Sequence, residues 1–258
     1  MEKTTIGTDE SISSIKLKDV VSFYKRHITP ENCTIIASGD ISMEELIIEI
    51  NKRIKFKNSG KNIINRIPYK LPTRGEKIVV SNNSVKQAVI KISYRIYPST
   101  SSFLIIRILN LVLTSSMASR LNIKLRVEKG LIYSIKVGRF TTNDIGSFSV
   151  NTTLSKEKVN DVINIILKEI EDIAKNGLKK EELDFAKNKT YNSVRKWYQT
   201  TEDWVDTNAL SETLFEDKKT NIDLLNDLMV IENKEIKDFA SKYLVREKAF
   251  IGICSADN

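Results

Sequence analysis

The segment "SRLNIKLRVEKGLIYS" (residues 119–134) joins a helix end, a glycine turn and the start of a strand. Residues 119–129 are predicted to be helical, and Gly130 suits the left-handed position that follows many helix ends. The next residues begin an apolar run typical of a strand. Because a helix end and the strand after a tight turn lie side by side, we expect Arg126 and Tyr133 to be neighbours.

Arg126 and Tyr133 have a structural and a functional interpretation. An Arg in the last turn of a helix interacts favourably with the helix dipole, and Tyr is common in strands. Alternatively, the two side chains are paired hydrogen-bond donors for a developing oxyanion. A Tyr with an ordinary pKa near about 10 remains protonated at neutral pH and can donate. The residues alone leave both interpretations open.

The rest of the sequence offers few residues suited to metal binding, nucleophilic catalysis or nucleotide binding. His27 is the single histidine, so a His-x-x-His metal pair cannot form. Cys33 and Cys254 lie in apolar runs without the spacing of a disulfide framework or a reactive site. The nine glycines form neither a P-loop nor a dinucleotide-binding pattern. We therefore expect no metal site and no cofactor in this chain.

Composition indicates an ordinary soluble globular protein, with 41% hydrophobic and 29% charged residues. No stretch approaches the roughly 18 to 20 apolar residues that cross a bilayer. The polar first residues lack the apolar region of a signal peptide, and the compartment is not indicated. The net charge is +8, but the lysines are spread along the chain. Because nucleic-acid binding needs a basic patch, we expect no nucleic-acid partner.

The predicted elements group strand pairs with helix pairs rather than alternating strictly. Strands are expected at residues 33–38, 76–83, 86–96, 131–140, 146–154 and 249–254. Helices are expected at residues 15–28, 42–54, 101–115, 119–129, 155–176, 179–199, 202–216, 221–229 and 233–243. This grouping favours an α+β fold in which an antiparallel sheet is covered by helices.

An internal repeat suggests how the chain is divided. Residues 18–40 align without gaps on residues 234–256, at an offset of 216 (234 − 18), and each copy reads as helix, turn and strand. If the repeat is real, residues 1–56 close one repeat, 57–73 form a linker and 74–258 form a complete domain. About 174 residues (216 − 42) of the first repeat would then precede Met1. The alternative is that helix-turn-strand units resemble one another anyway.

Three segments resemble the M16 (pitrilysin/insulinase-type) zinc peptidases. "SRLNIKLRVEKGLIYS" is similar to a segment of the family's second domain. "GTDESISSIKLKDVVSFYKRHITPENCTIIASGDIS" (residues 7–42) is similar to the segment that closes the first domain. "VIENKEIKDFASKYLVREKAFIGIC" (residues 230–254) matches the end of the second. The order of these landmarks is more specific than any one of them.

The resemblance implies an M16-like α/β sandwich with one complete repeat and the tail of another. In that family two homologous domains enclose an unfolded peptide, and the first carries zinc on an H-x-x-E-H motif. The second lacks zinc and contributes an Arg and a Tyr, here Arg126 and Tyr133, to the substrate carbonyl. Zinc is thus expected in a partner domain, in cis or as a separate subunit. The whole protein would be a zinc metalloendopeptidase, and this chain alone would be inactive.

Two other functions compete with the substrate-binding half of a peptidase. A structural or assembly subunit of the same fold would need no peptidase partner, although the presence of both Arg126 and Tyr133 argues against it. A basic nucleic-acid-binding module belongs to another class, and a steep dependence of binding on salt would reveal it. The natural substrate and the oligomeric state are not indicated by the sequence.

Overall fold

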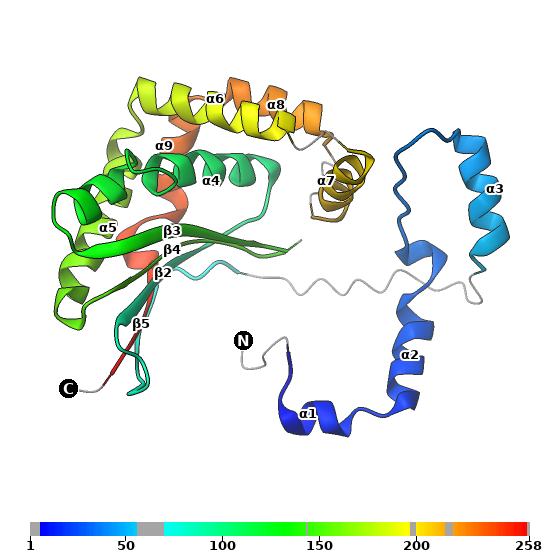
Figure 1. Ribbon diagram of the computed structural model, residues 1–258, viewed down its shortest axis with the longest axis horizontal. Helices are drawn as coiled ribbons and strands as arrows, with labels where there is room; N and C mark the ends of the chain where they lie inside the picture. Colours follow the sequence, from blue (N-terminus) through cyan, green and yellow to red (C-terminus); the bar gives the residue numbers. More distant parts are fainter. Residues whose placement is uncertain (1–5, 56–69, 143, 197–199, 215–218, 257–258) are drawn as a thin grey trace. The chain divides into compact units, whose positions relative to one another are not determined.

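The computed structural model describes residues 6–55, 70–142, 144–196, 200–214 and 219–256 (Figure 1). The chain divides into two compact units, Met1–Arg66 and Ile67–Asn258. The division predicted from the repeat, with its linker at 57–73, stays a prediction. Residues 57–69 of that linker lie outside the described residues, and the remaining four form neither helix nor strand.

The first unit is helical where it is described. Its elements are α1 (Asp9–Ser14), α2 (Leu17–His27), the 3₁₀ turn η1 (Pro30–Asn32) and α3 (Met43–Arg53). The predicted capping box of α3 is present, because Glu45 N donates to Ser42 Oγ and Ser42 N to Glu45 Oε2 (3.2 and 3.0 Å). None of these elements contains a buried residue, and Phe23 of α2 is 63% exposed.

The strand predicted at residues 33–38 is wrong, because these residues form neither strand nor helix. An apolar run becomes a strand only when a neighbouring strand satisfies its backbone N–H and C=O groups. No strand in the described part of the chain pairs with these residues. The equivalent run in the second copy of the repeat is paired on both sides.

The second unit contains a five-stranded sheet in the order β1-β5-β2-β4-β3. The strands are β1 (Lys77–Ser81), β2 (Ala88–Ile96), β3 (Ile132–Thr141), β4 (Gly146–Leu154) and β5 (Phe250–Ser255). Neighbouring strands are antiparallel except for β1 and β5, which are parallel. β1 and β3 are therefore the edges of the sheet, and β3 carries Tyr133.

Helices cover one face of this sheet (Figure 1). The α-helices are α4 (Thr100–Leu113), α5 (Val159–Asn176), α6 (Lys180–Lys196), α7 (Thr201–Leu214), α8 (Asn221–Val230) and α9 (Asn233–Tyr243). Short turns are the π-helical η2 (Asn122–Val127) and the 3₁₀ turns η3 (Lys156–Lys158) and η4 (Arg246–Lys248). α4, α5 and α9 contact the sheet, while α6 and α8 pack on α4.

The core lies between the sheet and these helices, and β2 shows the alternation that places it there. Ile90, Ile92 and Tyr94 are fully buried, whereas the residues between them are exposed or half-buried. Burying a side chain of this size contributes roughly 1.5–3 kcal/mol. The predicted α+β fold with a helix-covered sheet is confirmed. No helix among the described residues is long and apolar enough to span a bilayer.

Candidate functional site

The segment that carries Arg126 is a π-helical turn, not the regular helix predicted over residues 119–129. Glu128 N–H donates to the carbonyl of Ile123, five residues back, at 2.9 Å. Leu131 N–H then closes the turn on the carbonyl of Leu125 at 2.8 Å, across Gly130. The apolar spacing of the sequence does not distinguish this wider turn from an α-helix. Such turns are rare and are frequently found at functional sites.

The buried side chain of Asn122 fixes the start of this turn. Its Nδ2 donates to the carbonyls of Thr114 and Ser116, at 2.8 and 2.9 Å. It also lies 3.0 Å from Ser119 Oγ. These bonds join η2 to the loop that follows α4. A buried amide with satisfied hydrogen bonds holds a local conformation firmly, since leaving them unmade costs about 1–3 kcal/mol.

A β-bulge presents Tyr133 at the start of β3. Ile132 pairs with Leu154 and Ile135 with Thr152, so two residues of β3 face one residue of β4. Bulges of this kind re-aim a side chain, often next to a functional site. Tyr133 is 81% exposed, which is unusual for a large aromatic residue.

The structure brings the two predicted residues together. The Arg126 Cζ lies 5.1 Å from the centroid of the Tyr133 ring, within the range of a cation–π contact. The half-buried Arg126 also places Nη1 at 3.3 Å from Met117 Sδ. Within the described ranges, no carboxylate pairs with this guanidinium. Its remaining N–H groups are therefore available to a ligand.

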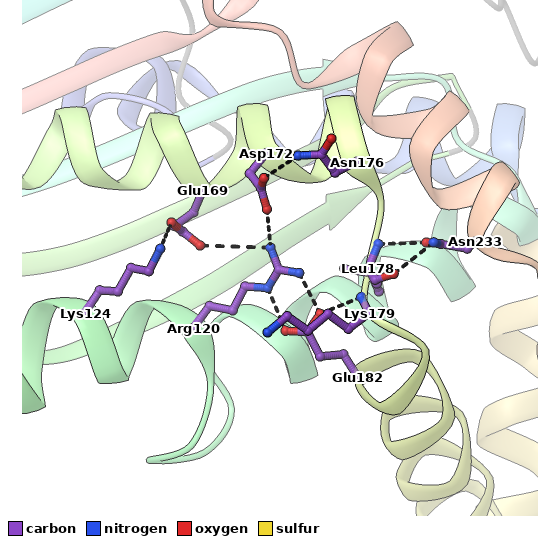
Figure 2. Close-up of polar contacts among 9 residues, drawn as sticks. All are labelled: Arg120, Lys124, Glu169, Asp172, Asn176, Leu178, Lys179, Glu182 and Asn233. Atoms are coloured by element: carbon purple, nitrogen blue, oxygen red, sulfur yellow. Dashed lines mark hydrogen bonds and ion pairs between the residues drawn. The ribbon is translucent and has the colours of Figure 1, made fainter.

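A charge cluster joins the start of this segment to two helices behind it (Figure 2). Arg120 donates from Nε and Nη2 to the two carboxylate oxygens of Glu182 on α6, at 2.7 and 2.6 Å. Its Nη1 donates to Asp172 on α5 at 2.9 Å, and Lys124 pairs with Glu169. The bidentate geometry is the strongest form of such a pair. We infer that this cluster holds the main chain that positions Arg126.

Burial and hydrogen bonding oppose each other at Glu182. Desolvation raises the pKa of this carboxyl, but hydrogen bonds from Arg120 and from the N–H of Lys179 outweigh it, and the net pKa is lowered. The hydrogen bonds to Glu182 in turn raise the pKa of Arg120. Both groups are therefore charged at neutral pH. The sequence did not reveal this cluster, because its partners lie 45 to 62 residues apart.

The α5–α6 turn beside the cluster is held from a third helix. Asn233, at the start of α9, accepts from the N–H of Leu178 at 2.7 Å and donates to its carbonyl at 2.9 Å. The preceding Gly177 has a φ of +76°. This contact sets where α6 begins and hence where Glu182 meets Arg120 (Figure 2).

Residues suited to zinc do not gather in the part of the chain that the structure describes. Within the described ranges, no three His, Cys, Asp or Glu side chains are placed to hold a metal. His27 packs its ring against Phe23 at 4.3 Å between centroids. Cys33 is exposed and Cys254 half-buried, and both are free thiols. The donor set therefore does not fit zinc.

Comparison with known proteins identifies the family. Residues 14–190 match the family described as the peptidase M16 inactive domain. The chain belongs to this family. The π-helical turn carrying Arg126 and the bulged strand carrying Tyr133 both lie inside the matched region.

Curated relatives of this M16 inactive domain are distant and longer. A protein of Helicobacter pylori named non-peptidase homolog YmxG is 23% identical over 93% of this chain and 55% of its own length. A protein of Bacillus subtilis named uncharacterized zinc protease YmxG is 20% identical over 98% of this chain and 61% of its own. The chain thus spans little more than half of each relative.

Solved structures share the fold at low identity. The crystal structure of a peptidase M16 inactive domain from Pseudomonas fluorescens matches with a TM-score of 0.78 and 17% identity, covering 99% of this chain and 61% of that one. A chain of complex III2 from Candida albicans matches with a TM-score of 0.82 and 17% identity, covering 98% and 62%. The predicted M16-like fold is confirmed.

Proposed function

We propose that this M16 inactive domain is the zinc-free, substrate-binding half of a metallopeptidase. Arg126 and Tyr133 donate hydrogen bonds to a carbonyl oxygen of an unfolded peptide and stabilise the oxyanion that forms there. The observation that carries the proposal is the contact between the two side chains: the Arg126 Cζ lies 5.1 Å from the centroid of the Tyr133 ring, and that ring is exposed. The facing domain, in cis or as a separate subunit, would hold zinc, which polarises the same carbonyl.

The surroundings of the pair support a role in binding rather than packing. A Tyr that served the core would be buried, whereas the bulge presents Tyr133 outward. Donors stabilise a transition state best when they are fixed before the reaction begins. The guanidinium of Arg126 contacts both the Tyr133 ring and Met117 Sδ. The Arg120 cluster holds the backbone that carries it.

The decisive experiment measures kcat and KM separately for an unfolded peptide, after the chain is combined with a zinc-bearing M16 domain from the same organism. Removing one oxyanion donor by Tyr133→Phe is expected to lower kcat by about 10² to 10³. Arg126→Gln should have an effect of similar size. Tyr97→Phe removes the hydroxyl of another exposed tyrosine and should leave the rate unchanged. Equal rates for all three variants would contradict the proposal.

The isolated chain provides a second test. Because the described residues include no group of three zinc ligands, we expect purified protein to contain no stoichiometric metal and to cleave no peptide. Metal analysis by mass spectrometry and a fluorogenic peptide assay would measure both. One zinc per molecule would overturn the assignment to the zinc-free half.

A structural or assembly subunit of the same fold is the second candidate. The name of the Helicobacter pylori relative, a non-peptidase homolog, favours it. This role requires a companion domain without H-x-x-E-H, whereas the peptidase role requires that motif. Sequencing the region that encodes the companion therefore separates the two functions.

A further inference from the structure

The outer side of the edge strand β1 is open for pairing. On its inner side β1 pairs with β5, and the Ile251 N–H donates to the Glu76 carbonyl at 2.8 Å. Residues along a strand direct their main-chain groups alternately to one side and the other. Lys77 and Val79 therefore direct their N–H and C=O groups away from β5. Within the described ranges, no strand pairs with that side.

The opposite edge of the sheet, β3, is protected against such pairing. A β-bulge interrupts it between Ile132 and Ile135, and Thr114 Oγ1 accepts from the Val137 N–H at 3.1 Å. Bulges and covered main-chain groups prevent sheets from joining edge to edge. β1 instead pairs with β5 in an uninterrupted register, and all five of its residues are exposed. Its single charged residue is Lys77, at its first position. β1 is thus the edge suited to pairing.

An exposed apolar strip reaches the same edge. Ile78 and Val80 are each 52% exposed. Val80 pairs with the half-buried Cys254, which pairs in turn with the exposed Val89 of β2. Paired residues share a face of the sheet, and this face is opposite the one on which Ile90 is buried. The strip therefore crosses three strands on the uncovered face and ends at β1.

We propose that β1 pairs with β1 of a second copy of this chain, antiparallel, about a two-fold axis at Val79. A two-fold contact requires a surface that complements itself. With the axis at Val79, the two copies of this residue exchange both main-chain hydrogen bonds. Ile78 then faces Val80 of the other copy, which continues the apolar strip across the contact. Lys77 faces the neutral Ser81, so no like charges oppose each other.

The pairing joins the two sheets into one and leaves the candidate site open. The sheet order places β3, which carries Tyr133, at the edge away from the contact. Two edges of five residues form a small interface, and small interfaces belong to weak complexes. We therefore expect a dissociation constant of about 1–100 µM. The proposal does not rest on the proposed peptidase role.

Sedimentation equilibrium of the full chain measures the dissociation constant of the dimer. Val79→Lys places two like charges opposite each other at the axis and should weaken association by about fivefold to tenfold. Val79→Glu should do the same by itself. An equimolar mixture of the two variants should restore association, because Lys then faces Glu. Val230→Lys makes the same change at an exposed residue that ends α8, and should leave the dissociation constant unchanged.

Hydrogen exchange of the unaltered chain locates the contact without a substitution. The Val79 amide points outward in the single chain and should exchange rapidly when the protein is dilute. As the protein concentration rises through the dissociation constant, this amide should become protected, because it is hydrogen bonded in the dimer. This measurement still tests the proposal if the charged variants fail to fold.

Four results would overturn the proposal. One is a chain that remains monomeric up to about 1 mM, where even weak association is measurable. Another is equal weakening by Val79→Lys and Val230→Lys, which would indicate repulsion by net charge alone. A mixture of the Lys and Glu variants that associates no better than either alone would exclude the axis at Val79. Exchange at the Val79 amide that is independent of concentration would place any association on another surface.

Discussion

Gly130 shows how one residue shapes the candidate site. It lies between the π-helical turn and β3 with a φ of +59°, in the left-handed region. A Cβ placed there would meet no atom within 4 Å. Any cost of a larger residue is therefore conformational and not steric. Its left-handed conformation was predictable from sequence, because glycine is the usual residue where a helix ends in this way.

Replacing Gly130 should lower the free energy of unfolding. Gly130→Ala forces an L-residue into the left-handed region and is expected to lower the free energy of unfolding by about 1–2 kcal/mol. Gly130→Asn should lower the free energy of unfolding by less, since Asn tolerates this conformation. Urea denaturation of the three proteins measures the difference. An alanine variant as stable as the unaltered chain would show that the turn relaxes to another conformation.

The local sequence pattern predicted the helices and strands whose packing or pairing partners are close in sequence. It failed for segments whose partners are distant in sequence. The amphipathic helices and the β3–β4 pair were recovered because their periodicity and turn residues are strong. Residues 33–38 have the same apolar character as β5, but strand formation depends on neighbours that local sequence does not encode. The π-helical turn was missed because it depends on hydrogen bonds from Asn122. The sequence predicted that Arg126 and Tyr133 are neighbours. It did not predict the β-bulge that exposes the Tyr133 ring.

The contact between η2, α5 and α6 should make stability sensitive to acid. The folded-state pKa of Glu182 lies below its ordinary value, so its contribution is present above about pH 4.3 and is lost as pH falls through the folded pKa. Urea denaturation between about pH 3 and pH 6 should show this loss as a falling free energy of unfolding. Glu182→Gln should reduce the slope of the free energy of unfolding against pH. Glu181→Gln alters the exposed neighbour and serves as the control. Identical slopes for both variants would contradict the assignment.

At the scale of the whole molecule, the described core belongs to the second unit alone. Every buried apolar residue identified in the described chain lies at Ala88 or beyond. The described helices of the first unit instead expose apolar side chains, including Leu17 at 79% and Tyr24 at 61%. The repeat and the resemblance to M16 peptidases predicted a division of the chain, but they did not predict that the described helices of the first unit expose their apolar side chains. The sequence could not show which apolar faces are buried, because burial is set by the elements that pack against them.

Deleting residues 1–66 should therefore leave the second unit folded. We expect the thermal midpoint of residues 67–258 to equal that of the main transition of the full chain, since the core residues are unchanged. Calorimetry measures the midpoint, and sedimentation should show less self-association once the exposed apolar helices are removed. Loss of a cooperative transition would show that the first unit contributes to this core.

The position of β5 has a consequence for how the protein folds. β5 lies between β1 and β2, and Lys77 of β1 pairs with Ile251 of β5. The edge strand β1 pairs with β5, which is synthesised much later in the chain. Pairings this distant in sequence raise contact order and slow folding. During synthesis, β2, β4 and β3 can associate early, while pairing of β1 must follow the emergence of β5 from the ribosome.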